Sequence, residues 1–200
     1  IAADVIGLAE VENETALRDL VRTLATDYNY IHHTGNDRRG IDLALLYKGD
    51  KFIPGSSRLV GSGAGREFLY VRGELAGEQI SILVCHMPSQ MNSRDYRAAA
   101  LASLYAFADA LHAAEPGLPV VVMGDFNTSP SERVMRKHFP ADAGVSETAG
   151  FIFSPFAGLA AQGQGTYCYN DRWLMYDNIF LSHHFSRGNG IQYTSCGVFI

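Results

Sequence analysis

Short apolar runs rich in Val, Ile, Leu and Tyr recur along the chain, and most have the length of a single β-strand. Polar or glycine-rich turns separate them. Several of these links are too short for a helical crossover, so we expect the strands that they join to be antiparallel neighbours. The pattern predicts strands over residues 5–9, 28–33, 41–47, 68–75, 80–85, 120–123, 173–182 and 191–200.

Other segments have the spacing of a helix. After Asn13, a typical N-cap residue, apolar positions recur on one helical face. The same spacing predicts a long helix over residues 94–114, and a shorter one is expected over 131–138. Residues 144–166 are expected to be mostly loop. Because strands and helices alternate without a repeat or linker, the sequence predicts one mixed α/β domain over residues 1–200.

The composition is typical of one globular domain, with 200 residues, of which 47% are hydrophobic and 18% charged. A chain of this length buries a large core, so a metal would serve function rather than folding. No apolar stretch is long enough for a membrane span. We expect a soluble monomer, and the sequence leaves its compartment open, export included.

The charge and cysteine counts narrow the choice of partner only in part. The net charge is −5, and no run of Lys or Arg, and no interleaving of basic and aromatic residues, indicates a tight nucleic-acid binder. Nucleic acid stays open as a substrate, because a hydrolase needs only transient contact and a bound cation adds positive charge. Cys85, Cys168 and Cys196 lack metal-binding spacing and are expected to be free, with a Cys168–Cys196 disulfide as the alternative in an exported protein.

Three predicted strands end in a polar residue, namely Glu10, His86 and Asp125. Sheets that carry function often place it at strand ends, where a rigid backbone directs a side chain into a cleft. Glu10 is a hard oxygen ligand of the kind that Mg²⁺ and Mn²⁺ prefer. The equally well supported alternative is a negative charge at the start of the helix that follows, where the helix dipole favours it. His86 can donate to a phosphate or act as an acid or base near neutral pH, although a lone His is more often structural.

Asp125 and Asn127 flank Phe126 after the most hydrophobic predicted strand. A carboxylate and an amide two residues apart can position a water, with the Asp accepting its proton. Taken alone, these residues favour the alternative of a simple turn built from Asp, Asn, Ser and Pro. Asp177 lies in an otherwise apolar run, where an unpaired carboxylate is costly. We therefore expect it to have a partner, either an Arg or a His that it orients.

Five segments occur in the same order as those of the endonuclease/exonuclease/phosphatase superfamily and resemble above all its bacterial nuclease-like members. The most specific is Gly-Asp-Phe-Asn at residues 124–127. Their order and spacing over nearly the whole chain make coincidence an inadequate explanation. The other four are the Glu motif at 4–11, with Ala9 where Gln is usual, Arg-Gly-Ile-Asp and the strand after it at 39–47, His-Met-Pro-Ser at 86–89, and the late segment at 165–182.

The resemblance implies a four-layered α/β sandwich of two packed mixed β-sheets flanked by helices. It implies that Glu10 binds Mg²⁺ or Mn²⁺ and that His86 contacts the phosphate. It also implies that Asp125 and Asn127 position or activate the attacking water, while Asp177 orients a histidine.

The resemblance is weaker at other positions. Arg39 and Ser89 are candidates for substrate contact, with a solvated charge as the alternative for Arg39. The superfamily normally begins with an Asn-containing strand and ends with a Ser-Asp-His motif, and neither is present, so we expect the chain to be incomplete at both ends. His183 and His184 lie too early to be that terminal His, and we expect them in an exposed loop. Asp177 then lacks its partner within these residues.

The expected function is metal-dependent hydrolysis of a phosphate ester, with a phosphodiester in nucleic acid as the first choice. A phosphatase or phosphodiesterase acting on small or lipid head-group phosphates is the alternative enzyme, which the acidic net charge keeps open. The alternative of another class is a non-catalytic binding domain that retains the fold. Several costly polar groups retained in one cleft argue against it.

Overall fold

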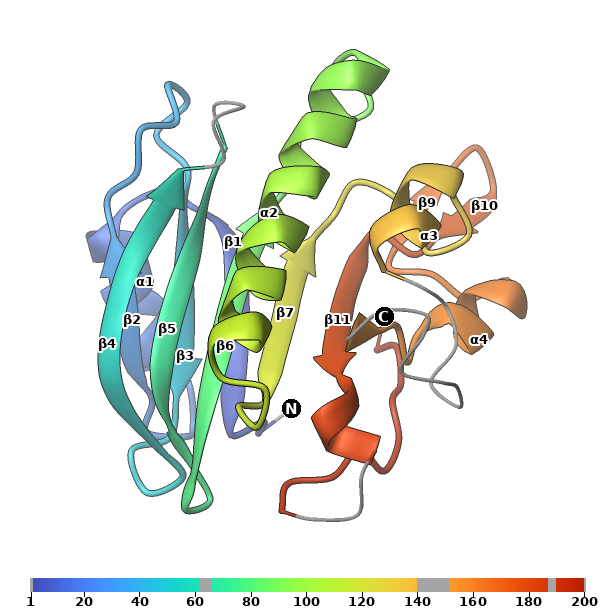
Figure 1. Cartoon of the computed structure of the whole chain (residues 1–200). Coiled ribbons are helices and arrows are strands. Elements are labelled where there is room, and N and C mark those ends of the chain that lie inside the picture. Colours follow the sequence, from blue (N-terminus) through green and yellow to red (C-terminus); the bar gives the residue numbers. More distant parts are fainter. Residues whose placement is uncertain (1, 62–65, 140–151, 187–189, 200) are drawn as a thin grey trace.

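Two β-sheets pack face to face, and each carries a helix on its outer face (Figure 1). This arrangement is seen in a computed structural model of the chain, which describes residues 2–61, 66–139, 152–186 and 190–199. The layers run from helix α1 through the smaller sheet and the larger sheet to helix α2. The α/β sandwich predicted from the sequence is confirmed.

The smaller sheet is antiparallel throughout, in the order β1 (Val5–Val11), β3 (Asp42–Tyr47), β2 (Asn29–His33). Helix α1 (Glu14–Thr23) follows β1 directly. The Asn13 side chain accepts a backbone N–H of its first turn at 2.9 Å, so the predicted N-cap is confirmed. The helix begins close to the end of β1, where Glu10 lies.

The larger sheet is mixed, because one strand pair is parallel and the others are antiparallel. The parallel pair is β6 and β7, which are joined by the long helix α2 (Arg94–Ala114), a crossover connection of the kind that parallel strands require. The strand order is β4 (Phe52–Gly61), β5 (Glu67–Leu75), β6 (Glu78–His86), β7 (Val120–Asp125), β11 (Asp177–Ser182) and β8 (Ile152–Phe153).

Several smaller elements lie between and after the last strands of this sheet, and the 3-10 helix that follows β11 is at the amino end of β7, because β11 is antiparallel to β7. A two-stranded hairpin, separate from both sheets, directly precedes β11. These elements are α3 (Arg133–His138), α4 (Ala157–Ala161), β9 (Tyr167–Tyr169), β10 (Arg172–Leu174) and the 3-10 helix His183–Ser186.

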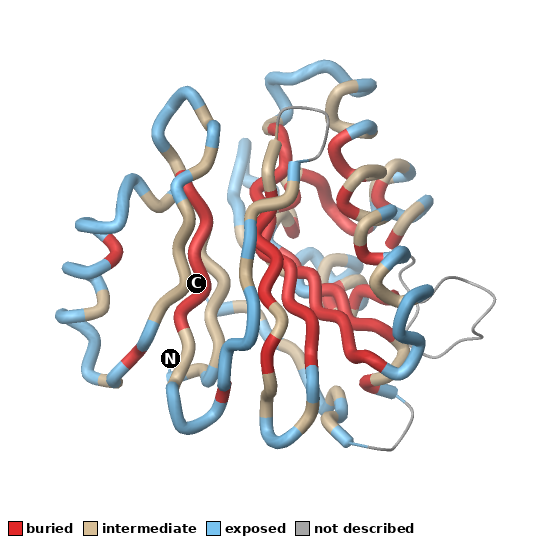
Figure 2. The backbone as a smooth tube through the Cα atoms, turned by 60° about the vertical axis from the view of Figure 1, so that its left-hand side comes forward, coloured by how far each residue is buried: buried red, intermediate tan, exposed pale blue. Residues whose placement is uncertain are grey.

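The period-2 alternation of the strands fills three apolar layers. On β5, Phe68 packs with the buried residues under α2, whereas its neighbour Leu69 packs between the two sheets. Leu17 of α1 closes a third layer on the outer face of the smaller sheet. Figure 2 shows that the central strands of the larger sheet are mostly buried by this packing, whereas its edge strand β4 is largely exposed. The strands are therefore held rigidly, and their ends are fixed relative to one another.

The predicted and observed strands differ in several places. The edge strand β4 was not predicted. Most of its residues are exposed, so its sequence lacks the alternation of apolar and polar residues that indicates a strand. The single strand expected over 173–182 is wrong, since Met175 and Tyr176 interrupt it and leave two strands in different sheets. The strand expected over 191–200 is also wrong for residues 191–199, which form no ladder.

The histidines near the C-terminus and the three cysteines were also the subject of sequence predictions. The expected exposed loop at His183 and His184 is instead a 3-10 helix in which both residues are half-buried. All three cysteines are free, and burial raises the pKa of the Cys85 thiol well above its usual value. Among the described residues, no helix combines the length and the hydrophobicity needed to cross a membrane.

One glycine is required by the fold and gives the first prediction. Gly124 has φ +135°, and a Cβ there would run into the backbone carbonyl of Cys85 on the neighbouring strand. We expect Gly124→Ala to lower the free energy of unfolding by about 3 kcal/mol or more, through backbone strain and overpacking together. Urea unfolding measures it.

A matched control separates the two causes. Gly77 also has a positive φ, +87°, but a Cβ there meets nothing within 4 Å. Gly77→Ala should therefore cost only the strain of about 1–2 kcal/mol. Equal losses for the two variants would show that the approach of β7 to β6 at Cys85 is not tight.

Candidate active site

The parallel pairing of β6 and β7 brings two of the predicted site residues together. In this register His86 lies opposite Asp125, and the Met87 N–H donates to the Asp125 carbonyl at 2.7 Å. The His86 side chain is only 8% exposed, and its Nε2 is 3.7 Å from Asp125 Oδ2. Both residues end their strands, so the rigid sheet sets the geometry between them.

Glu10 reaches the same point from the other sheet. The pairing of β1 with β3 is irregular between Leu8 and Val11, and Glu10 in this bulge has φ +60°. Its Oε1 lies 3.8 Å from His86 Nε2, and its side chain is 64% exposed. The three strand-end residues predicted from the sequence therefore converge at one end of the two sheets.

Asn127 holds the Asp125 carboxylate rather than standing free. Its backbone N–H donates to Asp125 Oδ1 at 2.7 Å, and its side-chain amide donates to Oδ2 at 3.0 Å. The same amide nitrogen also donates to the Met87 carbonyl at 3.0 Å. This arrangement needs Asn127 in the left-handed region, at φ +47°, which Asn tolerates better than most residues. The carboxylate is thus fixed in orientation on both of its oxygens.

Asp177 enters the site from the other side of β7. It is the first residue of β11 and pairs in register with Asp125. Its backbone N–H donates to Thr166 Oγ1 at 2.9 Å, and the residue is exposed. The expectation of a costly, buried carboxylate is therefore wrong, because the residue is exposed. Among the described residues the side chain has no hydrogen-bond or ion-pair partner, and its role in orienting a histidine stays a prediction.

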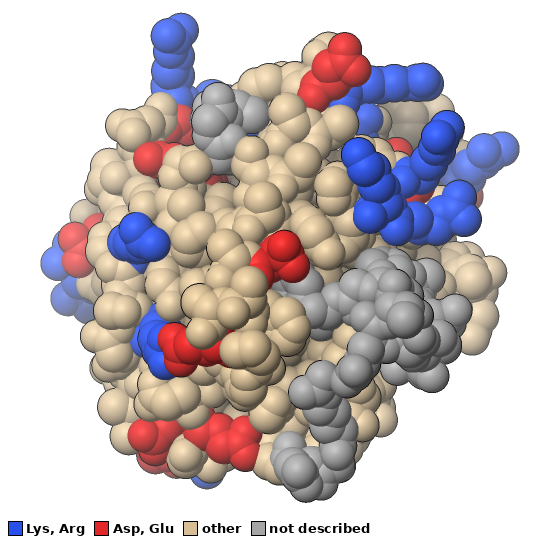
Figure 3. All heavy atoms as spheres, viewed as in Figure 1, with Lys and Arg blue, Asp and Glu red and all other residues tan. Residues whose placement is uncertain are grey.

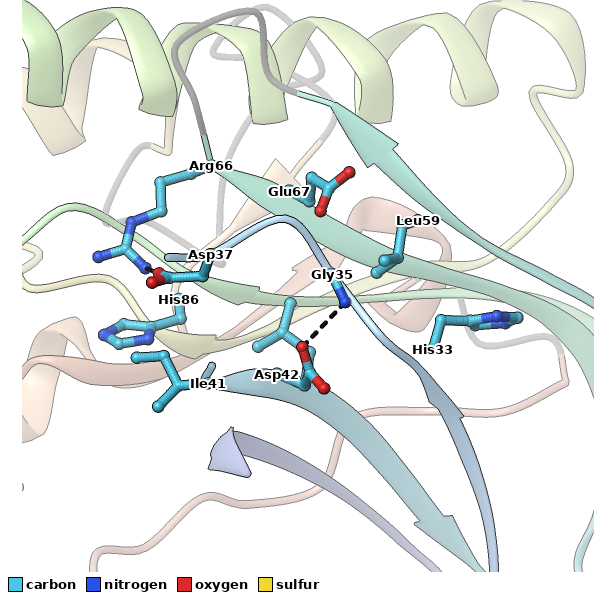
Figure 4. A pocket seen from close by; sticks show the side chains of 10 residues that line it. His33, Gly35, Asp37, Ile41, Asp42, Leu59, Arg66, Glu67 and His86 are labelled. Atoms are coloured by element: carbon cyan, nitrogen blue, oxygen red, sulfur yellow. Dashed lines mark hydrogen bonds and ion pairs between the residues drawn. The ribbon is translucent and has the colours of Figure 1, made fainter. Parts of the chain in front are cut away.

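A pair of arginines joined by one carboxylate lies beside His86. Asp37 accepts from Arg39 Nη2 at 3.1 Å and from Arg66 Nη1 at 2.6 Å. Figure 4 shows the Arg66 guanidinium at the same end of a small cavity as His86. The sequence reasoning missed Arg66 and Asp37, and the only available signal was a charged residue at the end of the glycine-rich turn before β5.

The cavity behind these residues has a volume of about 30 Å³. Asp42 lies at its floor, accepting from the Gly35 N–H at 2.9 Å and pairing with His32 Nε2 at 2.9 Å. These bonds close the base of the loop that carries Asp37 and Arg39. The lining residues are His33, Gly35, Asp37, Ile41, Asp42, Leu43, Leu59, Arg66, Glu67 and His86.

Ser89 serves the turn that leads into α2. Its carbonyl and Oγ both accept from Asn92 Nδ2, at 3.2 and 3.3 Å. The neighbouring Gln90 instead reaches toward the site and donates to the Asn127 carbonyl at 2.6 Å. The structure thus gives Ser89 local partners, whereas Met87 and Gln90 of this segment contact the Asp125–Asn127 loop.

Comparison with known families decides what this chain is related to. The model of the Endonuclease/Exonuclease/phosphatase family matches residues 1–199. The chain belongs to this family. The resemblance carried by the five sequence motifs is thereby confirmed.

Solved structures of the endonuclease/exonuclease/phosphatase fold agree. Truncated TDP2 of Caenorhabditis elegans is 18% identical, with a TM-score of 0.64 over 90% of this chain and 70% of that one. The human Nocturnin catalytic domain is 21% identical, with a TM-score of 0.63 over 90% and 69%. The Bacteroides thetaiotaomicron mannosyl-6-phosphatase Bt3783 is 18% identical, with a TM-score of 0.68 over 90% and 71%. No curated protein sequence gave a significant match.

The carboxylates of this family member have opposite electrostatic environments. Burial, opposed by the Asn127 N–H and reinforced by Asp177 and Glu10, raises the pKa of Asp125 from 3.8 to about 6. The hydrogen bond from Arg39 lowers the pKa of Asp37 to about 2. Burial first, and then Arg66, lowers the pKa of His86, so its imidazole is neutral at neutral pH.

The donor set fits a hard divalent cation such as Mg²⁺ or Mn²⁺ better than a softer cation that prefers thiolate or imidazole ligands. Within the described residues, no group of three or more His, Cys, Asp or Glu forms a ready-made metal cage. Glu10 instead offers an exposed carboxylate beside Asp125 and Asp177, whose repulsion a cation would relieve. Mg²⁺ and Mn²⁺ are commonly held in this way by one or two carboxylates, with water and phosphate completing the shell.

The raised pKa of Asp125 predicts how stability depends on pH without metal. The folded state binds this proton more tightly than the unfolded chain, so the stabilisation is full below about pH 4 and is lost as pH rises through about 6. Asp125→Asn lacks this titration. We expect the stability of the wild type relative to this variant to fall by about 2–3 kcal/mol between those limits.

Urea unfolding of both proteins in EDTA, at constant ionic strength and about half-unit pH steps, measures this difference. The two proteins can differ in their free energy of unfolding at low pH for other reasons. Only the change of this difference with pH reports the titration of the Asp125 carboxyl group. Parallel profiles across the whole range would contradict the raised pKa.

Proposed function

We propose that this protein is a divalent-metal-dependent phosphodiesterase that hydrolyses nucleic acid by in-line attack of an activated water. The observation that carries the proposal is the convergence of Glu10, His86 and Asp125 at one end of the two sheets. Membership of the endonuclease/exonuclease/phosphatase family supports the reaction class. Nucleic acid as the substrate rests on the resemblance of the sequence motifs to nuclease-like members.

Asp125 is the proposed general base for the attacking water. Its pKa of about 6 leaves it ionised at neutral pH yet basic enough to accept a proton in the transition state. Asn127 fixes both carboxylate oxygens, so the lone pair directed at the water keeps one orientation. In this assignment Asn127 acts through Asp125, and Asp177 acts by keeping the local charge negative.

His86 and the arginines are the proposed phosphate contacts. A neutral imidazole retains one N–H donor, and His86 lies between Glu10 and Asp125, where a phosphoryl oxygen would sit. Arg39 and Arg66 supply positive charge from one side, and Asp37 fixes both guanidiniums before substrate arrives. Glu10 would hold Mg²⁺ or Mn²⁺, which supplies charge stabilisation to the phosphoryl oxygens and the leaving group.

A phosphatase acting on small phosphates is the second candidate. The net charge of −5 disfavours a strong general affinity for nucleic acid. The similarity in fold to a protein described as a mannosyl-6-phosphatase supports keeping this candidate. The binding-domain alternative has less support, since a partly buried carboxyl group with a raised pKa is typical of catalytic sites.

The first activity prediction concerns the metal and the base. The whole protein should hydrolyse plasmid DNA and bis(p-nitrophenyl) phosphate with Mg²⁺ or Mn²⁺ and not in EDTA. Glu10→Gln should raise the metal concentration needed for half-maximal rate by about 10–100-fold, because it removes a charged ligand. Asp125→Asn should lower kcat by about 10²–10⁴-fold.

Glu12→Gln is the matched control, because Glu12 is an exposed carboxylate two residues from Glu10. It should leave the metal dependence unchanged. Turnover of phosphomonoesters without turnover of either diester would favour the phosphatase. If the folded wild type hydrolysed none of these esters, the non-catalytic binding domain would become the favoured function.

The second activity prediction concerns the arginine pair. Arg66→Gln should lower kcat/KM for a phosphodiester by about 100-fold, because it removes a fixed cation beside the phosphate. Asp37→Asn should lower it by about tenfold, since both guanidiniums remain but lose their common anchor. Steady-state kinetics at saturating metal measure both.

Arg38→Gln controls for the loss of one positive charge in the same loop. Arg38 is exposed and lies between Asp37 and Arg39 in sequence. Its replacement should leave kcat/KM unchanged at physiological ionic strength. A loss in Arg38→Gln equal to that in Arg66→Gln would assign the effect to net charge rather than to the position of Arg66.

A further inference from the structure

The β9–β10 hairpin and the residue before β11 present three tyrosine rings in nearly parallel planes. The rings of Tyr167 and Tyr169 are 6.4 Å apart, those of Tyr167 and Tyr176 are 5.4 Å apart, and both interplanar angles are 10°. Tyr167 is 46% and Tyr169 59% exposed. We call these three residues the tyrosine ladder. Aromatic rings gathered on a surface in this way commonly mark a binding site.

The ladder begins at the rim of the candidate active site. Thr166 Oγ1 accepts the backbone N–H groups of both Tyr176 and Asp177, at 3.2 and 2.9 Å. The Gln90 side chain hydrogen-bonds to the Tyr176 side chain and also donates to the Asn127 carbonyl. The innermost ring is therefore fixed to the segment that carries Asp125 and Asn127, and the other two rings lead away from it.

Exposed basic residues lie on the hairpin and on α3. Arg172 pairs in register with Tyr169 across the hairpin, so the two side chains share one face. Arg133, Arg136 and Lys137 are exposed on α3. Figure 3 shows a group of Lys and Arg side chains in the region of α3 and the hairpin. The molecule thus has a local basic and aromatic surface despite its net charge of −5.

We propose that the tyrosine ladder binds an unpaired nucleic-acid strand and leads it to the active site, an inference that rests on the proposed function. Unpaired bases stack on the rings, while the exposed cations of β10 and α3 contact the phosphates. A duplex keeps its base faces stacked internally and cannot use the rings in this way. Since every base has a π-face, binding on the ladder is independent of sequence.

Fluorescence anisotropy of a short labelled single strand, as DNA and as RNA, tests the proposal on the whole protein in EDTA, where no cleavage occurs. Tyr169→Ala should raise Kd about tenfold for the type of strand that the ladder binds, because one stacking surface is lost. Tyr169→Phe should bind within about twofold of the wild type, since it keeps the ring. A duplex of the same sequence should not respond to Tyr169→Ala.

Trp173→Ala is the matched control, because Trp173 is an exposed ring of the same hairpin that pairs with Cys168 on the opposite face. It should leave Kd unchanged. Wild-type affinity in Tyr169→Ala, or an equal loss for the duplex, would overturn the ladder. So would a loss of sugar-phosphate turnover in that variant without a loss of strand affinity, which would assign the rings to a sugar.

Hydrolysis of bis(p-nitrophenyl) phosphate by the wild type separates the two proposals. A ring-dependent affinity for single strands without hydrolysis of any ester would overturn the proposed function and leave the ladder standing. Hydrolysis of the small diester without a ring-dependent affinity would overturn the ladder and leave the proposed function standing.

Discussion

The parallel pairing of β6 with β7 is the constraint on which the site depends. It places His86 beside Asp125, and the Met87 N–H bond to the Asp125 carbonyl continues the pairing beyond the strand ends. The two backbones come so close at Gly124 that a side chain has no room there. Because the pair is buried on both faces, the separation of the imidazole and the carboxylate is set by the sheet and not by a flexible loop.

The charged groups around this pair give two carboxyl groups of the site different protonation behaviour. The pKa values of two carboxyl groups in the site are shifted in opposite directions. Burial and acidic neighbours raise the pKa of Asp125, whereas the arginines lower the pKa of Asp37. One is thereby suited to accept a proton near neutral pH, while the other stays ionised and holds cations in place. A phosphate and a divalent cation would each enter a region of opposite charge, so the site is organised for both before either binds.

The sequence predicted what depends on local periodicity and strand ends, and it failed where contacts join distant segments. Glu10, His86 and Asp125 could be predicted because each ends an apolar run. Arg66 could not, since its relation to the site arises through Asp37, 29 residues away. The exposed edge strand β4 lacks an apolar face, so its pattern did not indicate a strand. Residues 191–199 have the apolar pattern of a strand, but they pair with no neighbouring strand.

The hairpin before β11 links recognition to chemistry in the proposed function. Thr166 fixes both the residue that carries the innermost ring of the ladder, Tyr176, and the first residue of β11, Asp177, which pairs with Asp125. A base stacked on the outermost ring, Tyr169, would therefore rest on rings that are already ordered by the site. Ordering the hairpin in advance reduces the entropy lost when a flexible strand binds, so stacking would improve the position of the scissile phosphate as well as affinity. A small phosphate ester cannot gain this advantage, because it is too short to reach from Asp125 to the outer rings.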